Sequence, residues 1–338
     1  MSWLTANARA TLRRTRVVAL AFALGLSAAC GDDTPTAPTP PVIPPFTMQC
    51  PADVLGQSSS GAPVAIQVPS PTTAGGVLPV TVSCSPAGTA FPIGTTRIAC
   101  SASDARGVTA SCAFNVNVAP PPLPRTTFLA FGDSMTAGEI TMPTTFTLLP
   151  GLVPDVKQIV VPTESYPTEL LTLLRARFTT QAAQFVVTNA GLPREPAEDG
   201  ARRFPQVLTA SSAQVVLLLE GANDLAALGI RGITPATLGL QSMVRAARAR
   251  GATVFIASLP PPRPGGVNTL PLALVTAFND QIRLGAPIEG AIFVDLYAAL
   301  ATNLNLYIGI DGLHPTEAGY RRMADTFFAA IRAAFEAR

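Results

Sequence analysis

Five short apolar runs that alternate with helical patterns constrain the fold of the chain after Thr126 more than any other feature. Segments such as Thr168–Arg177 and Pro235–Arg250 have helical periodicity and lie between the runs. Runs that are apolar at nearly every position predict strands buried on both faces, and therefore a parallel sheet covered by helices on both sides. The predicted strands are Phe128–Phe131, Phe185–Thr188, Val215–Leu219, Thr253–Ala257 and Ala291–Val294.

Polar residues follow four of these five runs. In open parallel sheets, ligands bind beyond the carboxyl ends of the strands, so we expect these polar groups to meet in one crevice. They are Gly132-Asp133-Ser134 after the first run, Asn189-Ala190-Gly191 after the second, Glu220-Gly221-Ala222-Asn223-Asp224 after the third and Asp311-Gly312-Leu313-His314 after the fifth.

His314 is the single histidine of the chain. A lone histidine is more often structural than catalytic, but Asp311 precedes this one by three residues and Pro315 follows it. An aspartate at that spacing reaches Nδ1 and leaves Nε2 to face Ser134, whose hydroxyl needs a base to become a nucleophile. We therefore predict Ser134 as nucleophile, His314 as base and Asp311 as the residue that orients the base.

An oxyanion site requires hydrogen-bond donors beside the serine. The backbone N–H groups of Ser134 and Gly191 and the side-chain amide of Asn223 are the candidates. Taken singly, Gly191 is better explained as a turn glycine and Asn223 as a turn or cap residue. Asp133 and Asp224 are predicted to hydrogen-bond the loops that carry their neighbours.

The four blocks "FGDSMTAGE", "NAGLP", "EGANDL" and "DGLHPTEAGY" occur in this order, and in them residues 126–338 closely resemble the SGNH/GDSL hydrolase family. The resemblance implies a flavodoxin-like three-layer α/β/α sandwich with a parallel sheet and no metal or other cofactor. It implies hydrolysis of carboxylic esters through an acyl-serine, with Ser134, Asp311 and His314 as the triad and Ser134, Gly191 and Asn223 as the oxyanion hole. Met135 replaces the leucine that usually follows the serine, a volume-conserving change that we expect to be harmless.

The N-terminus has the pattern of an export signal. Arg13, Arg14 and Arg16 precede an apolar run that is too short to span a bilayer, and residues 1–29 are predicted to be a signal peptide. The end of the run, "LSAAC", resembles a bacterial lipoprotein signal with lipidation at Cys30, although Ser27 stands where a branched aliphatic residue is usual. Residues 30–45 are then a Pro/Thr-rich linker between a membrane anchor and the folded part. Ordinary secretion, with Cys30 removed or free, is the alternative.

Period-two alternation predicts antiparallel strands within residues 46–118, followed by a linker at 119–125. Four cysteines occur here, an even number in an exported segment, and they are the disulfide candidates. Three connectivities are possible. A predicted hairpin favours Cys100–Cys112, which leaves Cys50–Cys84. The stretch from "CPADV", with "FPIGTTRIACSASD", resembles the HYR (hyalin repeat) family, which implies an immunoglobulin-like β-sandwich associated with extracellular adhesion, here a spacer or carbohydrate-contacting module.

The net charge and the residue composition exclude some classes of binding partner. The net charge of +2 gives no electrostatic reason to expect nucleic acid. One histidine and no CxxC pair make a metal site improbable. We therefore expect an exported, membrane-anchored esterase acting on an acylated carbohydrate or a lipid, either a polysaccharide deacetylase or a lipase or lysophospholipase. A surface adhesion protein with an inactive hydrolase-like domain is the alternative from another class.

Two segments bear on substrate and packing. The insertion at 140–162 lacks clear periodicity and is either a surface loop or a lid that forms an acyl-binding wall. Its apolar residues favour the lid, and they are Phe146, Leu148, Leu149, Leu152 and Val153. Near the C-terminus, apolar residues at every fourth position predict a helix that packs on the sheet. These are Met323, Phe327, Ile331 and Phe335.

Overall fold

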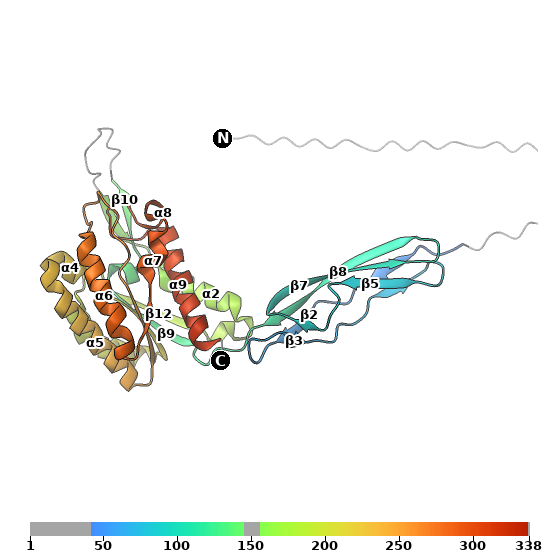
Figure 1. Ribbon diagram of the computed structural model, residues 1–338, viewed down its shortest axis with the longest axis horizontal. Coiled ribbons are helices and arrows are strands. Elements are labelled where there is room, and N and C mark those ends of the chain that lie inside the picture. The colour runs from blue at the N-terminus through green and yellow to red at the C-terminus, as the bar shows by residue number, and fades with distance from the viewer. Residues whose placement is uncertain (1–41, 145–155, 337–338) are drawn as a thin grey trace, which may run out of the picture. The chain divides into compact units, whose positions relative to one another are not determined.

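The computed structural model of the protein describes residues 42–144 and 156–336. An all-strand region comes first and an α/β region follows it, in blue to green and in green to red in Figure 1. Cys30 and the centre of the 140–162 insertion lie outside the described residues.

The all-strand region is built on a sheet with the strand order β2-β8-β7-β5. Two short pairs, β1 with β4 and β3 with β6, complete it. Alternate residues of β7 and β8 point into one core, which contains Ile98, Phe114 and Val116. The predicted alternation is thereby confirmed, and the region is of the β-sandwich class. The strands are β1 Thr47–Gln49, β2 Val54–Gln57, β3 Val64–Ala65, β4 Thr72–Ala74, β5 Thr81–Ser85, β6 Ala90–Phe91, β7 Gly94–Ser103 and β8 Thr109–Ala119.

The disulfides of this region correct the favoured pairing. All four cysteines are bonded, but as Cys50–Cys112 and Cys84–Cys100. Cys100 on β7 is directly opposite Cys112 on one side and Cys84 on the other. The Cα atoms of Cys84 and Cys100 are 4.1 Å apart, the short spacing of a non-hydrogen-bonded antiparallel pair, in which side chains come closest. The hairpin argument failed because it considered only one neighbour of β7.

The α/β region contains a five-stranded sheet with the order β12-β9-β13-β14-β15. Every pairing in it is parallel, and this order is flavodoxin-like. The third and fourth predicted strands begin and end as expected, whereas the second extends to Gly191. The strands are β9 Thr127–Gly132, β12 Val186–Gly191, β13 Val215–Leu219, β14 Thr253–Ala257 and β15 Ile292–Val294.

Helices cover both faces of this sheet (Figure 1). On one face α2 packs on α9, and on the other α3 and α6 flank α5. Helix α9 begins where Thr316 accepts a hydrogen bond from the N–H of Gly319 and buries Met323, Phe327 and Ile331, as predicted. No described helix is long and apolar enough to cross a membrane. The longer helices are α2 Tyr166–Arg177, α3 Ala197–Ser211, α5 Ile233–Ala249, α6 Leu272–Ile288 and α9 Glu317–Phe335, and the short ones are α1 Ser134–Ala137, α4 Ala222–Leu228, α7 Leu296–Ala301 and α8 Leu304–Tyr307.

The described ends of the 140–162 insertion are regular structure rather than loop. Strand β10 (Glu139–Pro143) pairs antiparallel with β11 (Val156–Val160). The apolar residues that favoured a lid all lie between these strands, outside the described residues, so the lid stays a prediction. The structure adds that the insertion begins and ends in a pair of strands, β10 and β11, close in sequence to α1.

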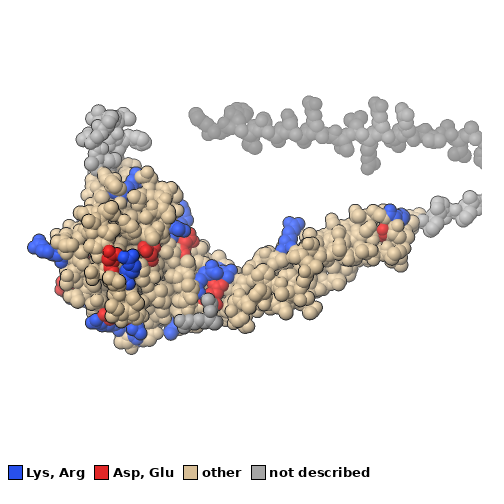
Figure 2. All heavy atoms as spheres, in the orientation of Figure 1, with Lys and Arg blue, Asp and Glu red and all other residues tan. Residues whose placement is uncertain are grey.

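The charged surface is sparse, in keeping with a chain in which charged residues make up 13%. Figure 2 shows basic and acidic side chains in small mixed groups on the face in view.

Glu220, which directly follows β13, is buried instead, with 1% of its surface exposed. Neither of its carboxyl oxygens has a hydrogen-bond partner among residues 42–144 and 156–336. Burial, followed by the nearby charges of Asp133, Glu195 and Asp224, raises the pKa of Glu220 well above its ordinary value.

Disulfide mapping tests the architecture of the sandwich. Peptide mapping without reduction should recover Cys50–Cys112 and Cys84–Cys100. The two bridges close loops of 62 and 16 residues, so replacing the Cys50–Cys112 pair by alanines should cost about 1 kcal/mol more of unfolding free energy than replacing the other pair. Recovery of a Cys100–Cys112 peptide would contradict the structure.

The buried Glu220 should make stability depend on pH. Its folded pKa is above the unfolded value of about 4.3, so its stabilisation is complete below that pH and is lost as the pH rises through the folded pKa. In urea titrations Glu220→Gln should have the same free energy of unfolding as the wild type near pH 4 and a higher one at pH ~8–9. The difference should grow by about 1.4 kcal/mol per pH unit between the two pKa values. Glu317→Gln, at an exposed site, is the control. Parallel pH profiles for wild type and Glu220→Gln would contradict the prediction.

Candidate active site

Ser134 is the first residue of the short helix α1, directly after β9. The preceding Asp133 caps this helix, because its Oδ1 accepts a hydrogen bond of 2.9 Å from the N–H of Met135. The turn is tight. A Cβ on Gly132 would lie 2.2 Å from the carbonyl oxygen of Leu219, so only glycine allows β9 to end this close to β13. The backbone thereby fixes where the serine hydroxyl can lie.

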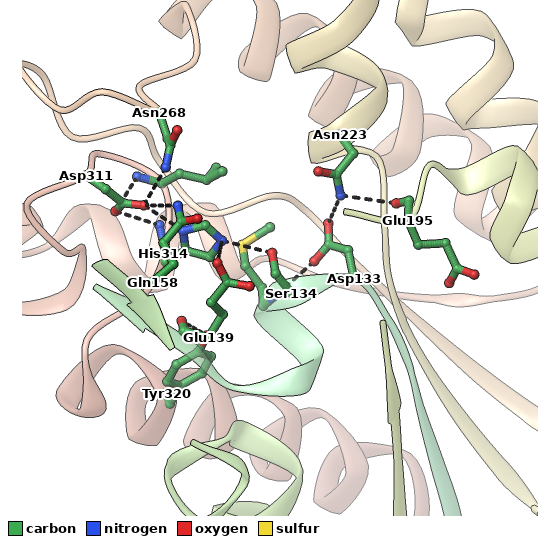
Figure 3. A network of polar contacts seen from close by, with 12 residues as sticks. Asp133, Ser134, Glu139, Gln158, Glu195, Asn223, Asn268, Asp311, His314 and Tyr320 are labelled. Atoms are coloured by element: carbon green, nitrogen blue, oxygen red, sulfur yellow. Dashed lines mark hydrogen bonds and ion pairs between the residues drawn. The ribbon is translucent and has the colours of Figure 1, made fainter. Parts of the chain in front are cut away.

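The structure brings Ser134, His314 and Asp311 into one hydrogen-bonded chain (Figure 3). Oγ of Ser134 is 2.9 Å from Nε2 of His314, and Nδ1 of His314 is 2.6 Å from Oδ2 of Asp311. Two segments far apart in the sequence, the turn that carries Ser134 and the loop from Asp311 to His314, therefore meet here. With Asp311 accepting from Nδ1–H, Nε2 carries the lone pair that can take the serine proton.

Asp311 is completely buried and is held by several donors. Its Oδ1 accepts from the N–H groups of Leu313 and His314, and its Oδ2 from the side-chain amides of Asn268 at 3.1 Å and Gln158 at 3.5 Å. Burial alone would raise the pKa of Asp311, but the hydrogen bond and charge of His314 and the bond from Asn268 outweigh it and hold that pKa far below its usual value. Asp311 is therefore a carboxylate at neutral pH.

Burial by itself would lower the pKa of His314. The hydrogen bond and charge of Asp311, with the charges of Glu139 and Asp133, more than offset this and raise the pKa above the ordinary histidine value. Asp133 is itself affected, since burial raises its pKa to about 7 despite the bond from Met135. The site thus gathers negative charge around one imidazole.

The proposed oxyanion donors differ in how free they are. The N–H of Ser134 has no acceptor among the described residues. The Nδ2 of Asn223 donates to the carbonyl of Glu195 at 3.1 Å and contacts Oδ2 of Asp133 at 3.5 Å. The N–H of Gly191 donates to Oδ1 of Asn189 at 3.0 Å. A Cβ on Gly191 would lie 2.1 Å from the N of Ala137, so this glycine is required for the approach of β12 to α1.

The cavity beside Ser134 has a volume of about 550 Å³, within the usual range for small-molecule sites. Ser134, His314 and Asn223 line it, but Gly191 does not. Helix α4 and the loop before α6 supply most of its apolar lining residues. The remaining lining residues are Glu139, Gln158, Arg194, Leu225, Ala226, Gly229, Val267, Asn268, Thr269, Leu270, Pro271, Leu274 and Leu313. In the described part of the chain, no cluster of three or more histidine, cysteine or acidic residues could hold a metal ion.

Several site residues have no counterpart in the sequence prediction. Asn268 follows the fourth strand, the one strand end to which no polar group was assigned, and that position was its signal. Gln158 comes from the insertion and has no motif. Arg194 lines the cavity with a φ of 67°, uncommon for a residue other than glycine, and its N–H has no acceptor among the described residues.

Family comparison agrees with this geometry. A model of the GDSL-like lipase/acylhydrolase family matches residues 130–322, and a model of the HYR domain matches residues 40–118. No curated protein matches the sequence.

Solved structures with a similar fold include a lipase/acylhydrolase from Enterococcus faecalis, with 19% identity, 63% of this chain and 98% of that chain covered and a TM-score of 0.48. Another is Est24, a carbohydrate acetylesterase from Sinorhizobium meliloti, with 16% identity, 62% and 100% covered and a TM-score of 0.47. Because the family match spans more than half of the chain, this protein, with its N-terminal HYR domain, belongs to the GDSL-like lipase/acylhydrolase family and is an ester hydrolase.

Proposed function

We propose that the protein hydrolyses carboxylic esters through an acyl intermediate on Ser134. His314 Nε2 removes the hydroxyl proton as Oγ attacks the ester carbonyl, and the resulting imidazolium gives that proton to the departing alcohol oxygen. Water then attacks the acyl-serine by the same route, which releases the acid and restores the serine. Asp311 keeps the ring in the tautomer that this sequence of proton transfers needs.

The observation that carries the proposal is the chain of two hydrogen bonds, 2.9 Å from Ser134 to His314 and 2.6 Å from His314 to the buried Asp311. Both are within the reach required of a nucleophile, its base and the orienting acid. A histidine retained for structure alone would not need a deeply buried carboxylate on one nitrogen and a cavity-lining serine on the other.

The negative oxygen of the tetrahedral intermediate is assigned to the N–H of Ser134 and the amide of Asn223. The third donor inferred from the sequence, the N–H of Gly191, serves only if Asn189 releases it. The N–H of Arg194 is the alternative third donor, because it has no acceptor in the described structure and its residue lines the cavity.

Two substrate classes are proposed. Polar lining residues, among them Gln158, Asn268 and Thr269, favour an ester whose alcohol part is polar, as in an acylated polysaccharide. A lipid or lysophospholipid is the second candidate, because large apolar side chains stay exposed next to the cavity-lining segments. These are Leu228, Ile230, Val267 and Leu272.

We also propose that the enzyme works outside the cytoplasm. Two disulfides in the HYR domain are typical of an oxidising compartment. The lipid anchor on Cys30, the spacer of residues 30–45 and the domain limits 46–118 and 126–338 are parts of the same proposal, supported by the sequence patterns alone.

The first test is hydrolysis of p-nitrophenyl esters from acetate to palmitate by the Phe46–Arg338 fragment. Ser134→Ala should lower kcat at least about 10⁴-fold, because no other group replaces the nucleophile. A preference for acetate would identify a deacylase of short acyl groups, and a preference for long chains would identify a lipase.

The control in this experiment is Ser211→Ala, a serine at the end of α3 whose hydroxyl donates to the carbonyl of Leu208 and which does not line the cavity. It should retain most of the turnover. Substantial turnover by Ser134→Ala would refute the assignment of the nucleophile. A folded wild type without turnover on any ester would favour the adhesion-protein alternative.

The anchor is tested in cells that produce the full chain. Radioactive palmitate should label the protein, and Cys30→Ser should abolish the label and release the protein from the membrane fraction. A chain that takes up no label would exclude lipidation and leave ordinary secretion.

A further inference from the structure

Glu139 is a buried acid at the active site to which the triad mechanism gives no role. It is the first residue of β10 and comes directly after the glycine that ends α1. The residue is 8% exposed and lines the cavity. Its Oε1 is 3.7 Å from Nε2 of His314, the nitrogen that also contacts Ser134. Figure 3 shows its carboxylate directed toward the histidine ring.

The backbone of Glu139 is held independently of its side chain. The hydroxyl of Tyr320, which is fully buried, donates a hydrogen bond of 2.6 Å to the carbonyl oxygen of Glu139. Pairing of β10 with β11 places Glu139 opposite Val160. Among the described residues, His314 is the one ionic partner of its carboxylate. The carboxylate is therefore set beside the ring by backbone contacts that do not depend on its charge.

His314 is charged whenever both ring nitrogens carry a proton, either in the free enzyme below its pKa or after Nε2 has taken the proton of Ser134 in the proposed mechanism. At that stage Asp311 is on the Nδ1 side of the ring, Asp133 is nearby, and Glu139 is on the Nε2 side. Arg194 is the basic side chain of the cavity lining. An opposite charge within about 4–6 Å favours the charged form of a titrating group, and burial weakens screening by solvent.

We infer that Glu139 is a positioning residue whose carboxylate stabilises the protonated His314 ring from the side of Ser134. The inference rests on the proposed role of His314 as the base. It has two opposing consequences. The imidazolium that forms during attack is stabilised, which lowers the barrier, but the ring also keeps its proton up to a higher pH in the free enzyme, which delays the onset of activity as the pH rises.

The chain offers a direct measurement, because His314 is its single histidine. In tag-free Phe46–Arg338, the imidazole proton resonances therefore report His314 without assignment. We expect Glu139→Gln to lower the pKa in this NMR titration by about one unit. The acid limb of kcat/KM against pH should move down by the same amount, and the plateau kcat should fall by up to about tenfold.

Two control variants distinguish the effect of the negative charge of Glu139 from the effect of a changed side-chain shape. Glu139→Asp keeps the charge at a greater distance and should give an intermediate titration. Asp325→Asn removes one negative charge from an exposed position of α9 and should leave both profiles unchanged. Circular dichroism of each variant checks that it is folded.

An unchanged or raised titration midpoint in Glu139→Gln would overturn the inference, even if turnover fell. Because the NMR titration does not require activity, this outcome is distinct from failure of the proposed function, which turnover by Ser134→Ala would reveal. A lowered midpoint with a matching shift of the acid limb would establish the role of Glu139.

Discussion

Parallel pairing of β9 with β12 on one side and β13 on the other is the constraint on which the site depends. The register aligns Gly132 with Gly191 and with Leu219, so three segments far apart in the sequence end at one edge. Close approach is possible only because Gly132 and Gly191 lack side chains that would collide with Leu219 and Ala137. The position of Ser134 is thus a consequence of backbone packing, and the histidine loop only has to reach a serine that is already fixed.

The sequence predicted the parts of this arrangement that depend on local pattern. Val215–Leu219 was recognisable as a strand because all five residues are apolar and buried. His314 was recognisable because it is the only histidine and has Asp311 at a spacing that reaches Nδ1. The wrong disulfide pairing has a different origin. Cys100 faces a cysteine on each side, and strand neighbours that are distant in sequence are not encoded in a local pattern. The direction of a single bond, such as the one from the N–H of Gly191 to Asn189, is not encoded there either.

Electrostatics link the site to the stability of the domain. Asp133, Glu139, Glu220 and Asp224 are all buried within the same end of the sheet, and a protein interior tolerates such acids only when they are paired, hydrogen-bonded or protonated. Asp311 is stabilised as a carboxylate by five donors, whereas Glu220 has none among the described residues and its protonated form is favoured. Ionisation of Glu220 therefore costs stability as the pH rises, whereas Asp311, Glu139 and Asp133 raise the pKa of His314 and favour the imidazolium on which the proposed mechanism depends.

The bonds of Asn223 indicate how this proposed oxyanion donor can be both oriented and available. Its Nδ2 has two hydrogens, and one is held by the carbonyl of Glu195 at 3.1 Å. The other makes only a long contact, 3.5 Å, to Asp133, near the limit at which a hydrogen bond stabilises anything. A developing negative oxygen competes easily for that second hydrogen, because charge-assisted bonds are shorter and stronger than neutral ones. The first bond meanwhile keeps the amide from rotating, so little reorganisation is needed when the intermediate forms.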